Sequence, residues 1–80
     1  MSENRERLVE CFRLVFPQLG ETEIAAASQA SLEAWDSTAA IMLVNVLEDE
    51  FAIEMDFDVL PELDSFDKVL AYVDSALKAA

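Results

Sequence analysis

Residues 35–51 read WDSTAAIMLVNVLEDEF and carry the clearest helix signals in the chain. Asp36 is a good N-cap, because its carboxylate can accept hydrogen bonds from the unpaired amides of a first helical turn. Trp35 precedes this cap and can pack back onto the helix as a hydrophobic staple. We therefore predict a helix that begins at Asp36-Ser37 and ends near Phe51. At about 100° per residue, its apolar stripe comprises Ala40, Leu43, Leu47 and Phe51, flanked by Ala39, Val44 and Val46.

The opposite face of this predicted helix combines polar and large apolar side chains. It comprises Thr38, Ile41, Asn45, Glu48 and Asp49, with Met42 at its edge. The face of a helix that points away from the core is usually polar, so Ile41 and Met42 are unexpected there. The acidic run at 48–50 lies at the helix end where the helix dipole disfavours acids. These acids are therefore either used by the protein or form a tolerated surface run.

The segment before this helix predicts another helix and a long connection. An amphipathic pattern runs from about Glu3 to Phe16, and Pro17 cannot continue the helical hydrogen-bond ladder. Residues 17–35 connect the two helices, and Glu21–Gln29 can contain one helical turn. A connection this long indicates that the two helices do not form a simple hairpin. The apolar face of the first helix comprises Leu8, Cys11, Phe12, Val15 and Phe16.

The segment after the helix predicts a loop and two further helices. Residues 51–57 alternate between apolar and polar, and without a partner strand we expect an extended loop with inward apolar side chains. Asp58–Leu63 is expected to form a short helical turn with Pro61 in its first turn. A final helix starts after Asp64 or Ser65, either of which can cap it. Its apolar stripe comprises Phe66, Val69, Leu70, Val73 and Leu77.

These elements predict an all-α fold in a single domain over residues 1–80. The chain has one glycine and two prolines, too few for the many turns of a small β-sandwich or barrel. We expect a small bundle of three main helices plus a short helix that is third in chain order. The first and last helices are expected to flank the second. The expected core comprises Leu8, Phe12, Val15, Phe16, Leu43, Leu47, Phe51, Leu63, Phe66, Val69, Leu70 and Val73.

The charge balance restricts the partners of this protein. Seventeen acids against five bases, with no histidine, give a formal net charge of −12. Such a surface repels nucleic-acid phosphates and anionic membranes, and it attracts basic protein surfaces. No apolar run approaches the roughly 20 residues that a membrane span needs, and the charged N-terminus shows no secretory signal. We therefore expect a cytoplasmic monomer that binds proteins rather than nucleic acids.

The absent histidines and the single cysteine exclude several chemistries. Without histidine there is no Ser–His or Cys–His nucleophile pair and no imidazole general base. Zinc bound by histidine is excluded, and one cysteine makes neither a thiolate cluster nor an internal disulfide. We expect no metal site. Cys11 is expected to be a small buried residue of the first helix rather than a reactive thiol.

Ser37 is the residue best placed for covalent chemistry. It is expected at the first helical position, directly after Asp36, where a hydroxyl is exposed beside unpaired backbone amides. A phosphate ester on this hydroxyl would lie at the positive end of the helix dipole. Capping alone also explains an Asp-Ser pair, so the pair has to be considered together with the sequence around it.

The wider pattern resembles the acyl carrier protein family. In that family an Asp-Ser-Leu motif opens the second helix, and a leucine, three acids and a phenylalanine close it. Here Asp36-Ser37 opens the predicted second helix, and residues 47–51 (LEDEF) close it at the same spacing. The resemblance covers essentially the whole chain and is most specific over residues 32–70. It implies the small helical bundle of an acyl carrier domain.

The resemblance also implies a carrier function, in which the protein is a shuttle and not an enzyme. Ser37 would be the attachment site of 4′-phosphopantetheine, transferred from coenzyme A by a phosphopantetheinyl transferase that uses its own Mg²⁺. The thiol of this arm holds acyl or aminoacyl groups as thioesters for partner enzymes of fatty acid, polyketide or other specialised biosynthesis. In the family the second helix docks against basic patches on these acyl-loading and acyl-processing enzymes. Carried over to this sequence, the docking face comprises Asp36, Thr38, Ile41, Met42, Asn45, Glu48 and Asp49.

Two positions depart from the family pattern. Thr38 replaces the usual leucine after the serine, and Met42 replaces a usual acid in the middle of the docking helix. Partners that recognise this acid are then expected to bind poorly, although single exposed apolar residues are also ordinary. The sequence WDS at 35–37 resembles stand-alone carriers of specialised pathways. The family can also enclose acyl chains between its second and last helices, where Leu47, Met55, Leu60, Leu63 and Val69 are either a lining or plain core.

Two other classes of protein compete with a carrier. A calcium sensor is suggested by Asp56 and Asp58, but a leucine occupies the third ligand position, Pro61 replaces the turn glycine, and no glutamate ends the loop. An unmodified acidic interaction module would instead use Ile41 and Met42 as an anchor in a partner's groove. This second alternative explains the apolar face but not the full spacing of the motif.

Overall fold

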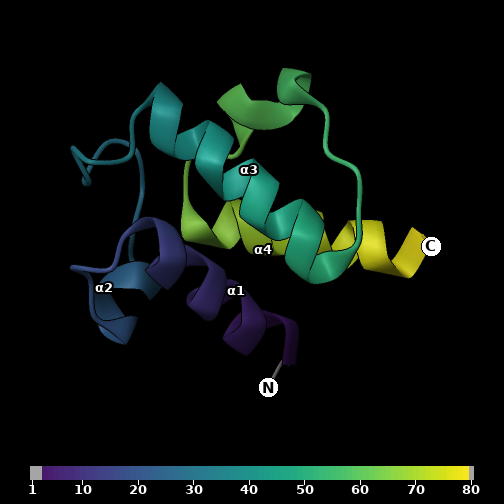
Figure 1. Ribbon diagram of the computed structural model, residues 1–80, viewed down its shortest axis with the longest axis horizontal. Coiled ribbons are helices and arrows are strands. Elements are labelled where there is room, and N and C mark those ends of the chain that lie inside the picture. The colour runs from purple at the N-terminus through teal and green to yellow at the C-terminus, as the bar shows by residue number, and fades with distance from the viewer. Residues whose placement is uncertain (1–2, 80) are drawn as a thin grey trace.

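The computed structural model describes residues 3–79, apart from the side chains of Phe57 and Ala79, and consists of helices joined by loops (Figure 1). Its elements are α1 (Glu3–Val15), α2 (Glu21–Ala25), α3 (Ser37–Phe51), the 3₁₀-helix η1 (Phe57–Glu62) and α4 (Phe66–Ala79). Over the described residues no strand forms, and the predicted all-α fold is confirmed. None of the described helices combines the length and the hydrophobicity that crossing a bilayer requires.

The predicted helix boundaries agree closely with the structure. α1 ends one residue before the predicted Phe16, whose N–H still donates to the Phe12 carbonyl at 2.7 Å. α3 spans the residues that its cap and periodicity predict. Ser65, rather than Asp64, caps α4, because its Oγ accepts a hydrogen bond from the Lys68 N–H at 3.3 Å.

The segment between α3 and α4 differs from its prediction in the position of Pro61. η1 begins at residue 57, and Pro61 lies near its end instead of in its first turn. A helix this short leaves most of its amides without a helical acceptor, so the missing N–H of proline removes little. Residues 52–56 form the predicted irregular loop, and Met55 turns inward as expected. The predicted inward turn of Phe57 lies outside the described side chains.

α1 is the element around which the other helices pack. It contacts α2, α3 and α4 more extensively than these helices contact one another, and it lies below α3 in Figure 1. This arrangement corrects the expectation that the first and last helices flank the second. The physical reason is the aromatic ring of Phe12. Its centroid lies 5.4 Å from that of Trp35 and 5.1 Å from that of Phe66, so one side chain of α1 joins two other segments.

The long connection before α3 is tied to the start of α4. The Gln29 N–H donates to the Asp64 carbonyl at 2.8 Å, and the Phe66 N–H donates to the Ala27 carbonyl at 3.0 Å. Ile24 of α2 is fully buried, so α2 is also anchored in the core. These contacts join residues far apart in the chain, and for that reason the local sequence pattern did not predict them.

The buried core contains most of the residues that the sequence predicts. Val15 and Leu70 are the exceptions, because both are only partly buried and pack against the core from its edge. The apolar stripes of α1 and α4 are therefore wider than the faces that neighbouring elements cover. Cys11 is buried, as expected. The buried core also contains residues outside the predicted core set, namely Val9, Ile24, Ala27, Trp35, Ala39, Ala40, Val44 and Met55.

The C-terminal end of α3 is stabilised by a cation from α1. Arg7 donates from Nη2 to the Glu50 carbonyl at 2.6 Å and from Nε to the Glu50 carboxylate at 2.9 Å. Its guanidinium carbon also lies 4.5 Å from the centroid of the Phe51 ring. Arg7 thus brings positive charge to the negative end of the helix dipole, where the acidic run alone would be unfavourable.

Ala52 ends α3 in the left-handed backbone conformation, with φ 54° and ψ 44°. A side chain disfavours this conformation by about 1 kcal/mol, and glycine is the usual residue there. We therefore expect Ala52→Gly to raise the free energy of unfolding by about 1 kcal/mol, measured by urea titration. The matched control is Ala71→Gly at an exposed position inside α4, which should lower it by about 1 kcal/mol. Equal losses in both variants would contradict the assigned helix end.

Candidate functional site

Ser37 is exposed at the N-terminus of α3. Asp36 caps the helix as predicted, because its Oδ1 accepts a hydrogen bond from the Ala39 N–H at 2.9 Å. Its backbone carbonyl accepts the first intrahelical bond, from the Ala40 N–H at 2.9 Å. The amides of Ser37 and Thr38 precede that bond and have no helical acceptor. The Ser37 hydroxyl therefore lies beside two amides at the positive end of the helix dipole.

An open cleft of about 280 Å³ adjoins Ser37. Its walls come from the N-terminal turns of α3, from the connection before α3 and from the end of η1. Apart from Ser37 and one glutamine, the lining side chains are apolar. The cleft is lined by Gln29, Ser37, Ala40, Ile41, Leu60 and Pro61. A flexible group attached to the serine would thus find an apolar surface next to its point of attachment.

A much smaller cavity lies in the core behind this cleft. Its volume is about 10 Å³, enough for one water molecule at most. Ala40 and Leu60 belong to the walls of both spaces, so these two side chains separate the cleft from the cavity. All five residues that were grouped from the sequence as a lining or plain core do line it. The full lining comprises Trp35, Ala40, Leu43, Val44, Leu47, Met55, Leu60, Leu63 and Val69.

Trp35 is buried with an unpaired polar atom. Its side chain is 3% exposed, and its indole Nε1–H has no hydrogen-bond acceptor among the described residues. The rings of Phe12 and Phe16 hold the indole, with centroid distances of 5.4 and 6.0 Å. An unpaired buried donor costs about 1–3 kcal/mol, and such groups are rare in proteins. The sequence predicted that Trp35 packs onto α3, but not that its N–H would lack a partner.

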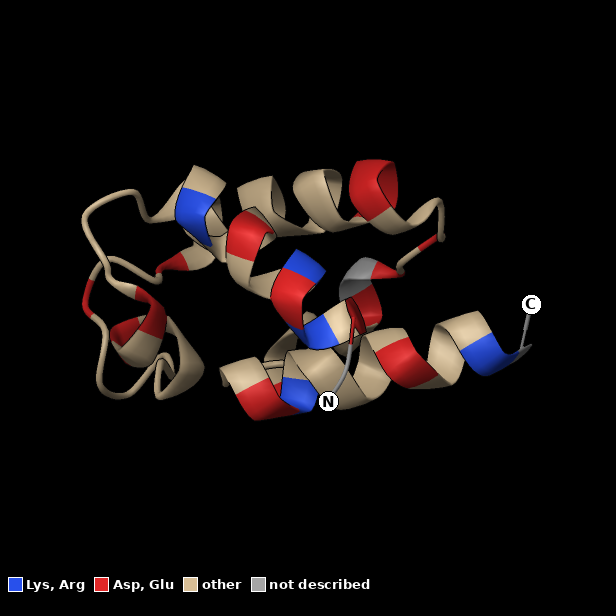
Figure 2. Ribbon diagram, turned by 90° about the horizontal axis from the view of Figure 1, so that it is seen from below, with Lys and Arg blue, Asp and Glu red and all other residues tan. Residues whose placement is uncertain are grey.

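The exposed face of α3 contains most of the predicted docking residues. Ile41 and Met42 are 45% and 49% exposed, so both apolar side chains lie at the surface of α3. Within the described chain, α3 holds no lysine or arginine, and the basic residues lie on α1 and α4 (Figure 2). The face therefore has an acid at each end, with the apolar pair Ile41 and Met42 between the polar residues Thr38 and Asn45. Its exposed members are Asp36, Thr38, Ile41, Met42, Asn45 and Asp49.

The acidic run at the end of α3 divides into structural and exposed members. The Glu48 side chain is half-buried and accepts a hydrogen bond from the Met55 N–H at 2.9 Å. Glu50 forms the ion pair with Arg7. Only Asp49 of this run is exposed without a hydrogen bond or ion pair to a described residue. Glu48, a predicted docking residue, is thus engaged in holding the loop after α3.

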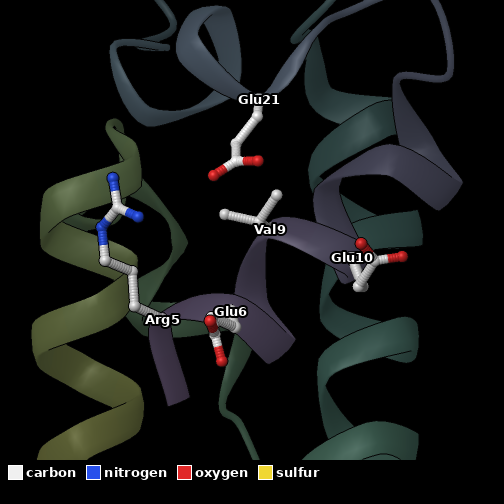
Figure 3. A pocket seen from close by; sticks show the side chains of 5 residues that line it. All are labelled: Arg5, Glu6, Val9, Glu10 and Glu21. Carbon is white, nitrogen blue, oxygen red and sulfur yellow. The ribbon is translucent and has the colours of Figure 1, made fainter. Parts of the chain in front are cut away.

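A second open cavity, of about 280 Å³, lies between α1 and the start of α2 (Figure 3). It is lined by Arg5, Glu6, Val9, Glu10 and Glu21 and shares no residue with the cleft at Ser37. Figure 3 shows Glu21 reaching from α2 toward Val9, with Arg5 to one side. Nowhere in residues 3–79 do three histidine, cysteine or acidic side chains meet in a way that could hold a metal ion.

Cys11 is unsuited to act as a nucleophile. The side chain is 2% exposed. Burial, followed by the negative charge of Glu50, raises the pKa of its thiol to about 11. The thiolate is the reactive form, so the folded protein holds this residue in its unreactive state near neutral pH. Ser37 is then the exposed hydroxyl or thiol for which the fold provides both a helix N-terminus and an adjoining cleft.

The predicted site residues come together at one end and along one face of α3. Ser37 and Asp36 lie at its N-terminus, and the docking residues follow along the exposed face. Sequence reasoning missed Gln29 and Pro61, which complete the cleft from other segments. Comparisons with protein family models, characterised proteins and solved structures find no match to this chain.

The buried thiol of Cys11 should make the protein less stable at alkaline pH. Because the pKa of Cys11 is raised from 9.0 to about 11 on folding, the folded state binds this proton more tightly than the unfolded state. Stability from this group is complete below pH 9 and is lost as the pH rises toward 11, by about 2 kcal/mol. We expect the difference in unfolding free energy between wild type and Cys11→Ala to fall over this range. A difference that is constant with pH would contradict the assignment.

The two adjacent acids of α3 should differ in their effect on stability. Glu48→Ala removes the acceptor of the Met55 N–H and is expected to lower the free energy of unfolding by about 1 kcal/mol. Asp49→Ala, the matched control, should change it by less than about 0.5 kcal/mol, because its side chain is exposed. Urea titration of both variants measures the difference. Equal effects of the two substitutions would contradict a stabilising role for the hydrogen bond between Glu48 and the Met55 N–H.

Proposed function

We propose that this chain is an acyl carrier protein that bears a 4′-phosphopantetheine arm on Ser37. The observation that carries the proposal is the position of the exposed Ser37 hydroxyl. Ser37 directly follows Asp36, whose side chain caps α3, and it adjoins a largely apolar cleft of about 280 Å³. The spacing from Asp36-Ser37 to the acidic end of α3 supports the same proposal. The arm supplies a terminal thiol that holds acyl or aminoacyl groups as thioesters.

The attachment needs only a hydroxyl from this chain. Ser37 Oγ attacks the β-phosphorus of coenzyme A and forms a phosphoester bond, while the phosphoanhydride bond breaks and 3′,5′-ADP leaves. The hydroxyl proton passes to a base of the transferase. The new phosphodiester keeps one negative charge, which the helix N-terminus and the amides of Ser37 and Thr38 favour.

The proposal assigns transport rather than catalysis to the chain. The side chains that line the cleft with Ser37 are apolar apart from one glutamine, so the cleft lining itself contains no carboxylate, lysine or histidine that could act as a general base. Partner enzymes would then do the chemistry on the carried group. We place this function in the reducing cytoplasm, which agrees with a single buried cysteine that has no partner for a disulfide.

The exposed face of α3 is the proposed docking surface. Asp36 and Asp49 offer negative charge at its ends, and Ile41 and Met42 form an apolar centre. A complementary partner has basic residues around an apolar contact, and the net charge of −12 would speed their encounter. Partners that require an acid at the position of Met42 are expected to bind weakly.

An unmodified interaction module is the second candidate. The observation that favours it is the pair Ile41 and Met42, whose exposures of 45% and 49% form an apolar patch on an otherwise polar face. Such a pair can insert into a groove of another protein without any arm on Ser37. The two candidates differ in one property, which is whether Ser37 can be modified.

Loading of Ser37 distinguishes the two functions. We expect the folded protein, incubated with coenzyme A, Mg²⁺ and a broad-specificity phosphopantetheinyl transferase, to gain the mass of one arm. It should also gain one thiol that reacts rapidly with a thiol reagent, because Cys11 is buried and unreactive. Ser37→Ala should fold normally and gain neither, whereas Ser75→Ala, at an exposed serine of α4, should behave as wild type.

The opposite results would remove the carrier proposal. Loading of Ser37→Ala would show that another residue receives the arm. No gain of mass with several transferases, on protein whose helical circular dichroism is intact, would favour the interaction module.

A further inference from the structure

We infer that Trp35 selects the cargo of this carrier, because its indole N–H donates a hydrogen bond to an oxygen atom on an enclosed acyl chain. The chain would lie in the cavity behind Ser37, expanded from its present volume of about 10 Å³. Oxygenated chains, such as oxo or hydroxy acyl groups, would therefore be enclosed in preference to saturated ones. The inference rests on the proposed attachment of the arm to Ser37.

Trp35 is the residue lining this cavity whose side chain carries an N–H group. The other lining residues are alanine, valine, leucine and methionine, none of which carries a side-chain N–H or O–H group. Trp35 is 3% exposed, and its Nε1 is the buried side-chain nitrogen or oxygen of the described residues that has no partner. A buried donor without an acceptor is an unusual feature, and an acceptor on a ligand in this cavity would satisfy it.

The surroundings of the indole keep this donor in place. Phe12 lies edge-on to it, with an angle of 80° between the ring planes, and Phe16 lies at a centroid distance of 6.0 Å. The Trp35 backbone is also held, because its N–H donates to the Leu32 carbonyl at 3.0 Å. The indole therefore cannot turn to the surface for water without disrupting the aromatic packing against α1.

The cleft beside the attachment site and the cavity lined by Trp35 are adjacent. The cleft at Ser37 and the cavity share the side chains of Ala40 and Leu60 as a common wall. Leu60 is half-buried and belongs to η1, a short 3₁₀-helix rather than a long packed helix. An outward shift of Leu60 would join the two spaces, and the apolar lining has no side-chain hydrogen bonds to break. Short elements of this kind open at low free-energy cost.

The selection follows from the unpaired donor. A saturated chain fills apolar space equally well but leaves the indole N–H without an acceptor. A chain with a correctly placed oxygen removes that defect, and buried hydrogen-bonding groups discriminate strongly between such analogues. The protein is therefore expected to be stabilised more by an oxygenated cargo than by a saturated cargo of the same length.

The single tryptophan makes the test direct, because the indole N–H gives one resolved signal in a ¹H–¹⁵N spectrum. The arm is loaded onto Ser37 as octanoyl, 3-oxooctanoyl, 5-oxooctanoyl or 7-oxooctanoyl amide analogues, and loading is verified by mass before any spectrum is recorded. We expect at least one oxo chain to shift the indole proton downfield. Its exchange with solvent should slow by about threefold to tenfold relative to the octanoyl form.

Trp35→Phe provides the matched variant. It removes the donor and keeps an aromatic ring, and its smaller ring affects every cargo alike. In wild type the effective oxo chain should raise the midpoint of thermal unfolding above that of the octanoyl form, and in Trp35→Phe this difference should disappear.

Three results would overturn the inference. An indole signal that is identical for the oxo and octanoyl forms, or unchanged by every chain, would show that the donor does not meet the cargo. A preference for oxo chains that persists in Trp35→Phe would assign the selection to another group. Failure of the arm to load would be seen in the mass alone and would remove the carrier proposal together with the inference.

Discussion

The edge-on contacts of Phe12 hold three separate segments of this small protein together. Its ring centroid lies 5.4 Å from Trp35, in the connection before α3, and 5.1 Å from Phe66, at the start of α4. Phe16 adds a second ring against Trp35 at 6.0 Å. Since Trp35 directly precedes the cap of α3, this aromatic packing also determines where Ser37 emerges at the surface. The exposed hydroxyl is thus attached to a well-packed part of the core.

The two ends of α3 illustrate two ways of satisfying a helix terminus. At the N-terminus the Asp36 side chain satisfies one amide, and the first two amides stay available to an anion. At the C-terminus Arg7 donates to the Glu50 carbonyl and carboxylate, and Glu48 accepts from the loop that follows. The N-terminal end therefore keeps two amides without a helical acceptor, while the C-terminal end is held by contacts with the rest of the fold.

The acidic residues of α3 have different structural roles, which the net charge alone does not reveal. The exposed face of α3 is free of basic residues, and two of the three acids at its end are occupied within the fold. The acidic and apolar side chains of this face that stay exposed are Asp36, Asp49, Ile41 and Met42. In the proposed docking, shape around the apolar pair matters as much as charge, because exposed ion pairs contribute little individually.

The local sequence determined the three long helices, their approximate boundaries and the position of Ser37 at the start of α3. Capping by Asp36 and the periodicity of 37–51 are properties of adjacent residues, so they could be predicted without the fold. The same holds for the exposure of Ile41 and Met42, which follows from their place on the helix.

Only the tertiary structure decided the central position of α1, the division of the acidic run and the cleft beside Ser37. Each of these depends on residues that are distant in the chain, such as Arg7 against Glu50. The missing partner of the Trp35 N–H is of the same kind, because whether a buried donor finds an acceptor depends on every segment that surrounds it. Adjacent residues set the form of each helix, and long-range packing alone set which side chains meet.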